Sequence, residues 1–165
     1  MNLPRKKRRN FPDHQVRDAA NQFDDARLLL EAQPPGSGLL LPLVNNAVVA
    51  LELYLKSLGA IAVYTPSPEV SIVTAEAEVK GHGLILILES IPDDVRHSLE
   101  EAYTARYTDR VLRDDLKKCE GLFVASRYAF EGNGSDSYPF VPLRNLCSFL
   151  RDFVWKMKTF ARRDL

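Results

Sequence analysis

The chain has 165 residues, of which 45% are hydrophobic and 27% are charged. This length suits one compact domain and is too short for two ordinary ones, and the composition excludes a disordered or fibrous protein. The formal net charge is zero, from 22 basic and 22 acidic side chains. Basic residues nevertheless gather at both ends, so the segment between them is acidic.

The basic residues at the start of the chain are Arg5, Lys6, Lys7, Arg8 and Arg9. We expect residues 1–12 to form a disordered basic tail before a single domain over residues 13–163. Clustered cations attract polyanions such as RNA, and the alternative is a solvated tail that aids solubility or nuclear import. Near the other end lie four more basic residues: Lys156, Lys158, Arg162 and Arg163.

No pattern in the sequence indicates export or a membrane span. Polar residues 10–20 follow the basic start, so we expect no signal peptide and a cytoplasmic location. Cys119 and Cys147 are widely spaced and belong to no CxxC pair, so we expect reduced, buried thiols and no zinc site. The most apolar region, residues 39–64, contains Glu52 and Lys56, which are costly in hydrocarbon, so a buried core helix fits it better.

Apolar residues at helical spacing predict a first helix over residues 13–33, with Asp13 as its N-cap. Its predicted inward stripe is Val16, Ala19, Ala20, Phe23, Ala26 and Leu30. A second helix, apolar on most faces, is predicted over residues 39–58 and belongs in the middle of a bundle. Later helices are predicted over residues 93–107, 109–131 and 142–163.

Two segments between these helices are ambiguous. Residues 84–88, Leu-Ile-Leu-Ile-Leu, fit a buried strand or a helix, and we favour the helix. Residues 60–81 contain two prolines and a β-branched run, so this connector is either a short extended hairpin or a mobile functional loop. The pattern as a whole predicts an all-α, up-and-down bundle of five or six helices.

The familiar enzyme signatures are absent from the sequence: there is no GxxxxGK[ST], GxGxxG, HExxH or GxSxG string. His14, His82 and His97 are scattered, so we predict no metal and no cofactor. Four pairs of adjacent acidic residues occur, among them Asp24 with Asp25 and Asp114 with Asp115. Neighbouring helical residues diverge by about 100°, so we interpret these pairs as caps and solvated faces rather than catalytic dyads.

Three short strings stand out along the chain. They are ELYLK at residues 52–56, GHGL at residues 81–84 and SRYAFE at residues 126–131. Glu52 and Lys56 have both the i,i+4 spacing and the acid-before-base order that favour an ion pair. Arg127 and Glu131 have the same spacing in the opposite order. Taken singly, each string favours a structural role over a functional one.

In this order the three strings resemble the HEPN superfamily, in which an ELYLK helix, a GHDL-like helix start and a WRYxxE-like helix recur. The resemblance spans roughly residues 15–160. It implies an up-and-down helical bundle, a homodimer, and RNA or nucleotide binding or RNA cleavage. It also implies service in toxin–antitoxin or defence systems, with an antitoxin or a nucleotidyltransferase-like protein as the partner.

One departure from the family pattern bears on catalysis. Ribonuclease members carry an Arg-x4-6-His motif on a late helix, whereas no histidine follows His97 in this chain. The spacing occurs at Arg9 and His14, where Pro12 disfavours a continuous helix. The resemblance therefore favours a non-catalytic domain that binds RNA, a nucleotide or a protein.

Two alternatives stay open: a metal-independent endoribonuclease that uses Arg127 with His82, and a structural, antitoxin-like interaction protein. In either case a buried charge requires a partner, so we predict a polar cluster that joins Glu52 to Arg127. The cluster is expected to draw on six residues: Glu52, Lys56, His82, Arg127, Tyr128 and Glu131.

Overall fold

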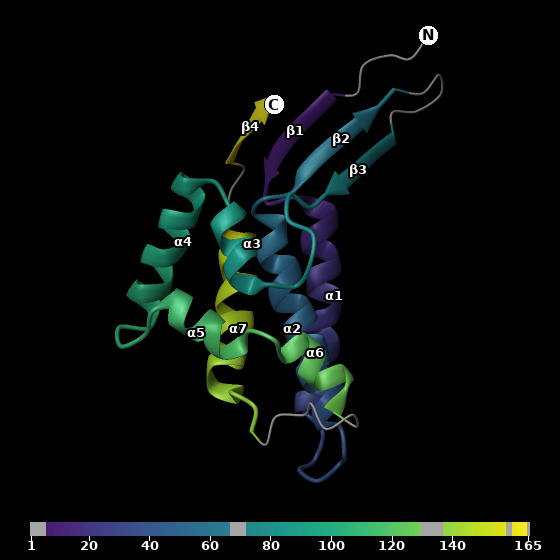
Figure 1. The fold of residues 1–165 in the computed structure, drawn as a ribbon, viewed down its shortest axis with the longest axis vertical. Coiled ribbons are helices and arrows are strands. Elements are labelled where there is room, and N and C mark those ends of the chain that lie inside the picture. Colours follow the sequence, from purple (N-terminus) through teal and green to yellow (C-terminus); the bar gives the residue numbers. More distant parts are fainter. Residues whose placement is uncertain (1–5, 67–71, 130–136, 158–159, 165) are drawn as a thin grey trace.

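The computed structural model describes residues 6–66, 72–129, 137–157 and 160–164. The fold is mostly helical, with a small antiparallel sheet at one end of the helices (Figure 1). The helices are α1 His14–Glu31, α2 Leu40–Ser57, α3 Leu84–Ser90, α4 Asp93–Arg106, α5 Leu112–Cys119, α6 Leu122–Arg127 and α7 Phe140–Lys156. The strands are β1 Lys6–Phe11, β2 Ile61–Thr65, β3 Ile72–Glu76 and β4 Phe160–Asp164.

Helix α2 is the centre of the bundle, as its apolar sequence predicts. It packs against α1, α3, α6 and α7, and Leu51, Tyr54 and Leu55 are fully buried on it. The Asp13 side chain caps α1 by accepting hydrogen bonds from the amides of Gln15 and Val16, which confirms the predicted start of that helix.

The helical interpretation of residues 84–88 is confirmed, because α3 covers them and buries Leu84, Ile87 and Leu88. The predicted helix after Pro92 is confirmed as α4. The single helix predicted over residues 109–131 is wrong, since the chain breaks between α5 and α6. Gly121 lies at the break with φ of 78°, a left-handed conformation that glycine adopts without a Cβ clash.

The all-α prediction holds only in its coarser part: the fold is mostly helical, but it also contains a four-stranded antiparallel sheet. Its strand order is β3-β2-β1-β4, with every neighbouring pair antiparallel. The hairpin alternative for residues 60–81 is confirmed by the pairing of β2 with β3. Residues 1–12, expected to be a disordered tail, contain β1, and the last helix ends at Lys156 and is followed by β4.

These corrections have one physical cause. Strands β1 and β4 come from the two ends of the chain, and each satisfies its backbone groups only by pairing with a distant segment. Neither strand shows a strong local pattern, so periodicity along the chain could not reveal them. Arg5 of the predicted tail lies outside the described residues.

Among the described residues, no helix combines the length and the apolar character needed to cross a bilayer.

Both cysteines are free and buried, as the sequence predicts. Burial raises the pKa of the Cys119 thiol to about 12. Burial also raises the pKa of the Cys147 thiol well above its usual range. We therefore expect the native protein at neutral pH to react slowly with Ellman's reagent, because the reactive thiolate is scarce and shielded. The absorbance of the thionitrobenzoate that the reagent releases should rise quickly only after the protein is denatured. Rapid modification of both thiols in the native protein would contradict this expectation.

Candidate functional site around Glu52 and His82

The Glu52 carboxylate lies on α2, and its side chain is 7% exposed. Lys56, one turn later, places its Nζ 2.6 Å from Glu52 Oε1, which confirms the predicted i,i+4 ion pair. The same Nζ donates to the carbonyl oxygen of Gly81 at 3.0 Å. Lys56 thereby connects the loop before α3 to the C-terminal end of α2.

His82 supplies the second partner of Glu52. Its Nδ1 lies 2.8 Å from Glu52 Oε2, and its side chain is 51% exposed. The imidazole ring stacks on the ring of Phe123, with the centroids 3.9 Å apart and the planes at 18°. A carboxylate at Nδ1 favours the tautomer with its proton there, which leaves Nε2 as the acceptor of a neutral ring.

Among the described residues, Arg127 contacts this cluster through Phe123. Its guanidinium carbon lies 4.7 Å from the centroid of the Phe123 ring, and its side chain is exposed at the end of α6. We expected Arg127 to pair with Glu52, but Glu52 is paired with Lys56 and His82 instead. Tyr128 is 43% exposed beside Arg127, and Glu131 lies outside the described residues.

Position 83, where the HEPN pattern has an acid, lies close to two flexible side chains. Gly83 is the N-cap of α3, and a Cβ there would meet Glu120 Oε1 and Leu86 Cδ1, each at 3.3 Å. The other oxygen of Glu120 accepts the amide N–H of Ile85 at 3.3 Å. The carboxylate at the start of this helix therefore comes from the α5–α6 break rather than from the cap residue.

The site joins Glu52 and Lys56 of the first string to His82 of the second, and Phe123 connects His82 to Arg127 of the third. It presents an imidazole, an aromatic ring and a guanidinium on one part of the surface, above a buried carboxylate. Such a combination can stack on a nucleobase and contact a phosphate. The available Nε2 of His82 can also accept a proton.

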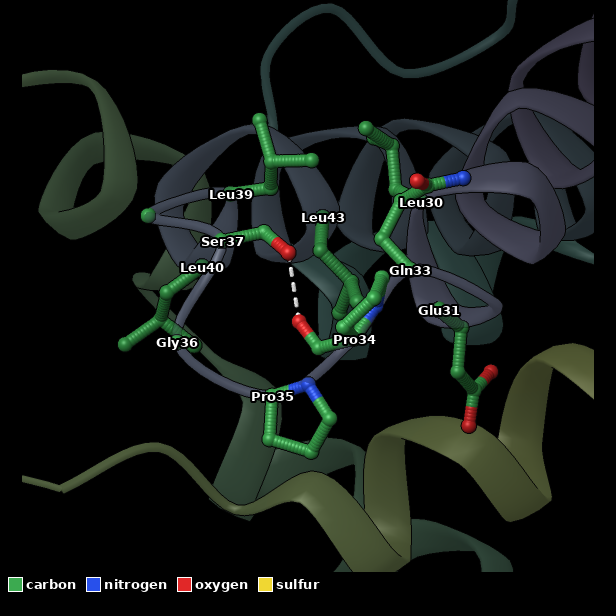
Figure 2. A pocket seen from close by; sticks show the side chains of 11 residues that line it. Leu30, Glu31, Gln33, Pro34, Pro35, Gly36, Ser37, Leu39, Leu40 and Leu43 are labelled. Carbon is green, nitrogen blue, oxygen red and sulfur yellow. Dashed lines mark hydrogen bonds between the residues drawn. The ribbon is translucent and has the colours of Figure 1, made fainter.

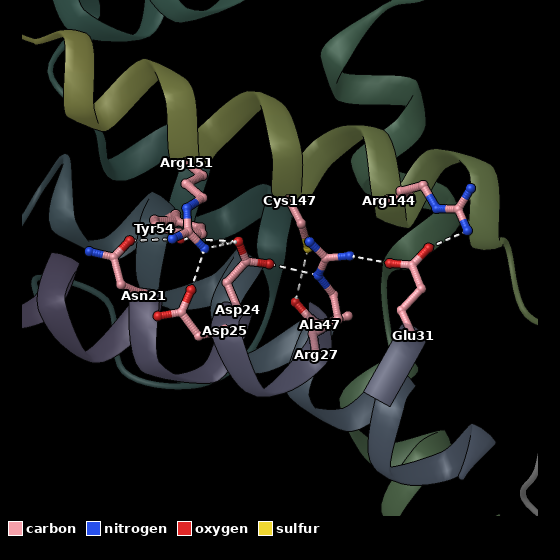
Figure 3. Close-up of polar contacts among 10 residues, drawn as sticks. All are labelled: Asn21, Asp24, Asp25, Arg27, Glu31, Ala47, Tyr54, Arg144, Cys147 and Arg151. Carbon is pink, nitrogen blue, oxygen red and sulfur yellow. Dashed lines mark hydrogen bonds and ion pairs between the residues drawn. The ribbon is translucent and has the colours of Figure 1, made fainter. Parts of the chain in front are cut away.

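A larger polar network, which the sequence did not reveal, joins α1 to α7 (Figure 3). Asp24 is fully buried and accepts from Arg27 Nε at 2.6 Å and from Arg151 Nη1 at 3.0 Å. Arg27 also donates to Glu31 at 2.6 Å, and Glu31 pairs with Arg144 on α7. These charges occupy the interior of a helix interface, so we interpret the network as structural.

A second buried carboxylate belongs to Asp115 on α5. It accepts hydrogen bonds from Tyr103 Oη at 2.7 Å, from Arg110 at 3.0 Å and from Lys118 at 2.9 Å. The interpretation of the adjacent acidic pairs as caps and solvated faces is therefore wrong for Asp24 and Asp115. Asp24 and Asp115 each lie at helical spacing from buried residues of their own helix, and this spacing was a signal that could have indicated their burial.

An open groove of about 520 Å³ lies at the turn between α1 and α2 (Figure 2). Its walls include the side chains of Leu30, Leu39 and Leu43 and the Pro34–Pro35 bend, and they are largely apolar. None of the predicted site residues lines it. The groove is therefore separate from the site of Glu52 and His82.

Within the described part of the chain, no group of three or more His, Cys, Asp or Glu side chains is placed to hold a metal ion. Comparison of the chain with protein-family models, with curated proteins and with solved structures found no match.

Proposed function

We propose that this chain is a non-catalytic HEPN-like domain that binds RNA through the surface of His82, Phe123 and Arg127. The convergence of three distant strings supports the proposal: Glu52 and Lys56 hold the loop of His82, and His82 stacks on the ring that Arg127 also contacts. Strings that resemble one family at separate places in the sequence thus contribute to one site.

RNA is the ligand that the exposed groups suit best. Single-stranded RNA is recognised by stacking its bases on aromatic, histidine or arginine side chains, with cations on the phosphates. His82 and Arg127 are both exposed, and Phe123 is half-buried between the two contacts that it makes. A purely apolar face would instead suit a protein partner.

The test is the binding of a short fluorescein-labelled oligouridylate, measured by fluorescence anisotropy. Because the Phe123 ring is already covered by His82 and Arg127, the base-stacking platform is the exposed face of the His82 ring. Loss of one such platform costs about 1–3 kcal/mol, so His82→Ala is expected to weaken binding roughly 5- to 150-fold. Lys117→Gln, on the exposed side of α5, is the matched surface control and should bind as the wild type does. Far-UV circular dichroism verifies that both variants fold. Unchanged binding by folded His82→Ala would overturn the proposal.

The Glu52–His82 pair favours one second candidate, a metal-independent endoribonuclease. A carboxylate that holds Nδ1 of a half-exposed histidine leaves Nε2 available as a general base, and Arg127 shares a ring contact with that histidine. We still expect no cleavage of RNA in the presence of a chelator, because no Arg-x4-6-His motif occupies a late helix. Cleavage lost in both His82→Ala and Arg127→Ala would establish the ribonuclease instead.

The homodimer, the antitoxin-like role and the nucleotidyltransferase-like partner stay predictions from the resemblance alone.

A further inference from the structure

A pocket of about 160 Å³ lies where α1, α2 and α7 meet. Its apolar walls are the side chains of Leu43, Ala47, Phe140 and Leu143. Ala47 and Leu143 are buried whereas Phe140 is 41% exposed, so the pocket extends from the interior of the bundle to the surface. Leu43 also lines the groove at the α1–α2 turn, which makes the groove and the pocket neighbours (Figure 2).

Three charged side chains complete the lining of this pocket: Arg27, Glu31 and Arg144. The side chain of Arg27 is 5% exposed, and two carboxylates hold it, because its Nε donates to Asp24 and its Nη1 to Glu31. Glu31 in turn pairs with Arg144, whose side chain is 66% exposed (Figure 3). The pocket therefore combines an apolar interior with charged groups that are fixed by their neighbours.

Arg144 ends a chain of alternating charges. Arg27 lies between the carboxylates of Asp24 and Glu31, and Glu31 lies between the guanidinium groups of Arg27 and Arg144. Among the described residues, Arg144 has one charged partner, Glu31, which it contacts through Nη2. A guanidinium carries several N–H donors in a planar fork and can bind a carboxylate through two of them. Arg144 thus retains donors for a further carboxylate at the mouth of the pocket.

We propose that this pocket binds a small aromatic carboxylate, with its ring between Leu43, Phe140 and Leu143 and its carboxylate on Arg144. The volume suits a ligand with one ring, since an engineered apolar cavity of about 150 Å³ binds benzene. Apolar walls with a few fixed polar groups are the usual composition of a small-molecule site. The pocket shares no residue with the surface of His82, Phe123 and Arg127, so the inference does not rest on the function proposed above.

Fluorine NMR titration of the full chain with para-fluorobenzoate tests the inference, and para-fluorobenzamide is the neutral ligand of similar shape. Arg144→Gln removes the charge at the mouth of the pocket, and Phe140→Ala removes one apolar wall. Arg113→Gln is the matched control, because Arg113 also pairs with a single glutamate, Glu89, and does not line the pocket. Circular dichroism verifies the fold of each variant.

Hydrogen bonds to charged groups are the strong ones, so Arg144→Gln should weaken the binding of the acid about 10- to 150-fold. The amide has no charge to lose, so Arg144→Gln should affect it much less, and the preference of the protein for the acid should disappear. Phe140→Ala should weaken the binding of both ligands. Arg113→Gln should bind both as the wild type does.

The inference is overturned if the wild type shows no saturable binding of the acid, or if it binds the acid and the amide equally. It is also overturned if folded Arg144→Gln keeps the wild-type preference for the acid, because a merely structural role of Arg144 would change both affinities together. The variant His82→Ala should bind the acid as the wild type does. The RNA site and the carboxylate pocket can therefore fail independently.

Discussion

Replacing Asp24 with alanine is expected to lower the free energy of unfolding by about 3–5 kcal/mol, the cost of removing one partner from a buried ion pair. Asp24 is fully buried, and Arg27, whose side chain is 5% exposed, donates to it at 2.6 Å (Figure 3). Without the carboxylate, the Arg27 charge keeps only its contact with Glu31. Arg151 on α7 loses a partner at 3.0 Å as well.

Tyr54 contributes to the same expectation. Burial, followed by the negative charge of Asp24, raises the pKa of Tyr54 well above its usual range. Its hydroxyl therefore remains a donor, directed to Asn21 at 2.9 Å and to Asp24 at 3.5 Å. The alanine variant weakens this buried arrangement between α1, α2 and α7.

Urea unfolding followed by circular dichroism measures the effect, and the neighbouring aspartate is the matched control. Asp25 also pairs with Arg151, at 2.7 Å, but its side chain is 59% exposed. Solvent-exposed ion pairs contribute at most about 1 kcal/mol, so Asp25→Ala should cost less than that. Equal losses in the two variants would show that burial does not determine the effect.

The second prediction concerns Asp115, whose loss should cost about 2–3 kcal/mol at neutral pH. Alanine leaves the buried Tyr103 hydroxyl without its partner at 2.7 Å. The expected cost is smaller than for Asp24 because Arg110 and Lys118 are partly exposed and can be hydrated when the carboxylate is removed. The adjacent Asp114→Ala is the control, because Asp114 is exposed.

The stabilisation by Asp115 should also depend on pH. Burial alone would raise the pKa of Asp115, but hydrogen bonds from Tyr103, Lys118 and Arg110 outweigh burial and hold it below its usual value. The ionised form is thus favoured by folding, so its stabilisation is complete above the unfolded pKa of about 3.9 and is lost as the pH falls further. The difference in stability between wild type and Asp115→Asn should shrink below about pH 4. A difference that grows on acidification would contradict the assignment.

Local sequence patterns were sufficient for the helices that have strong periodicity. The Asp13 cap, the apolar α2 and the α3 run were all predicted, because capping and burial depend on residues within a few turns. The i,i+4 pair of Glu52 with Lys56 was predicted for the same reason.

The inward face of α1 was only partly predicted. Phe23, assigned to the buried stripe, is 38% exposed, whereas the adjacent Asp24 is fully buried. Hydrophobicity alone predicts that Phe23, rather than Asp24, is the buried residue of this pair. The arginines of α1 and α7 reverse that preference, because they make burial of the carboxylate favourable at this interface.

The sequence by itself determined a mostly helical domain and the residues of its central helix, because these follow from short-range spacing. Only the tertiary structure decided that His82, rather than Arg127, is the partner of Glu52, because both residues are distant from Glu52 in the sequence and local spacing does not choose between them. Only the tertiary structure joined the two basic ends as β1 and β4. The pairing of β1 with β4 is set by contacts between residues that are 149 to 156 positions apart, and no local pattern encodes it.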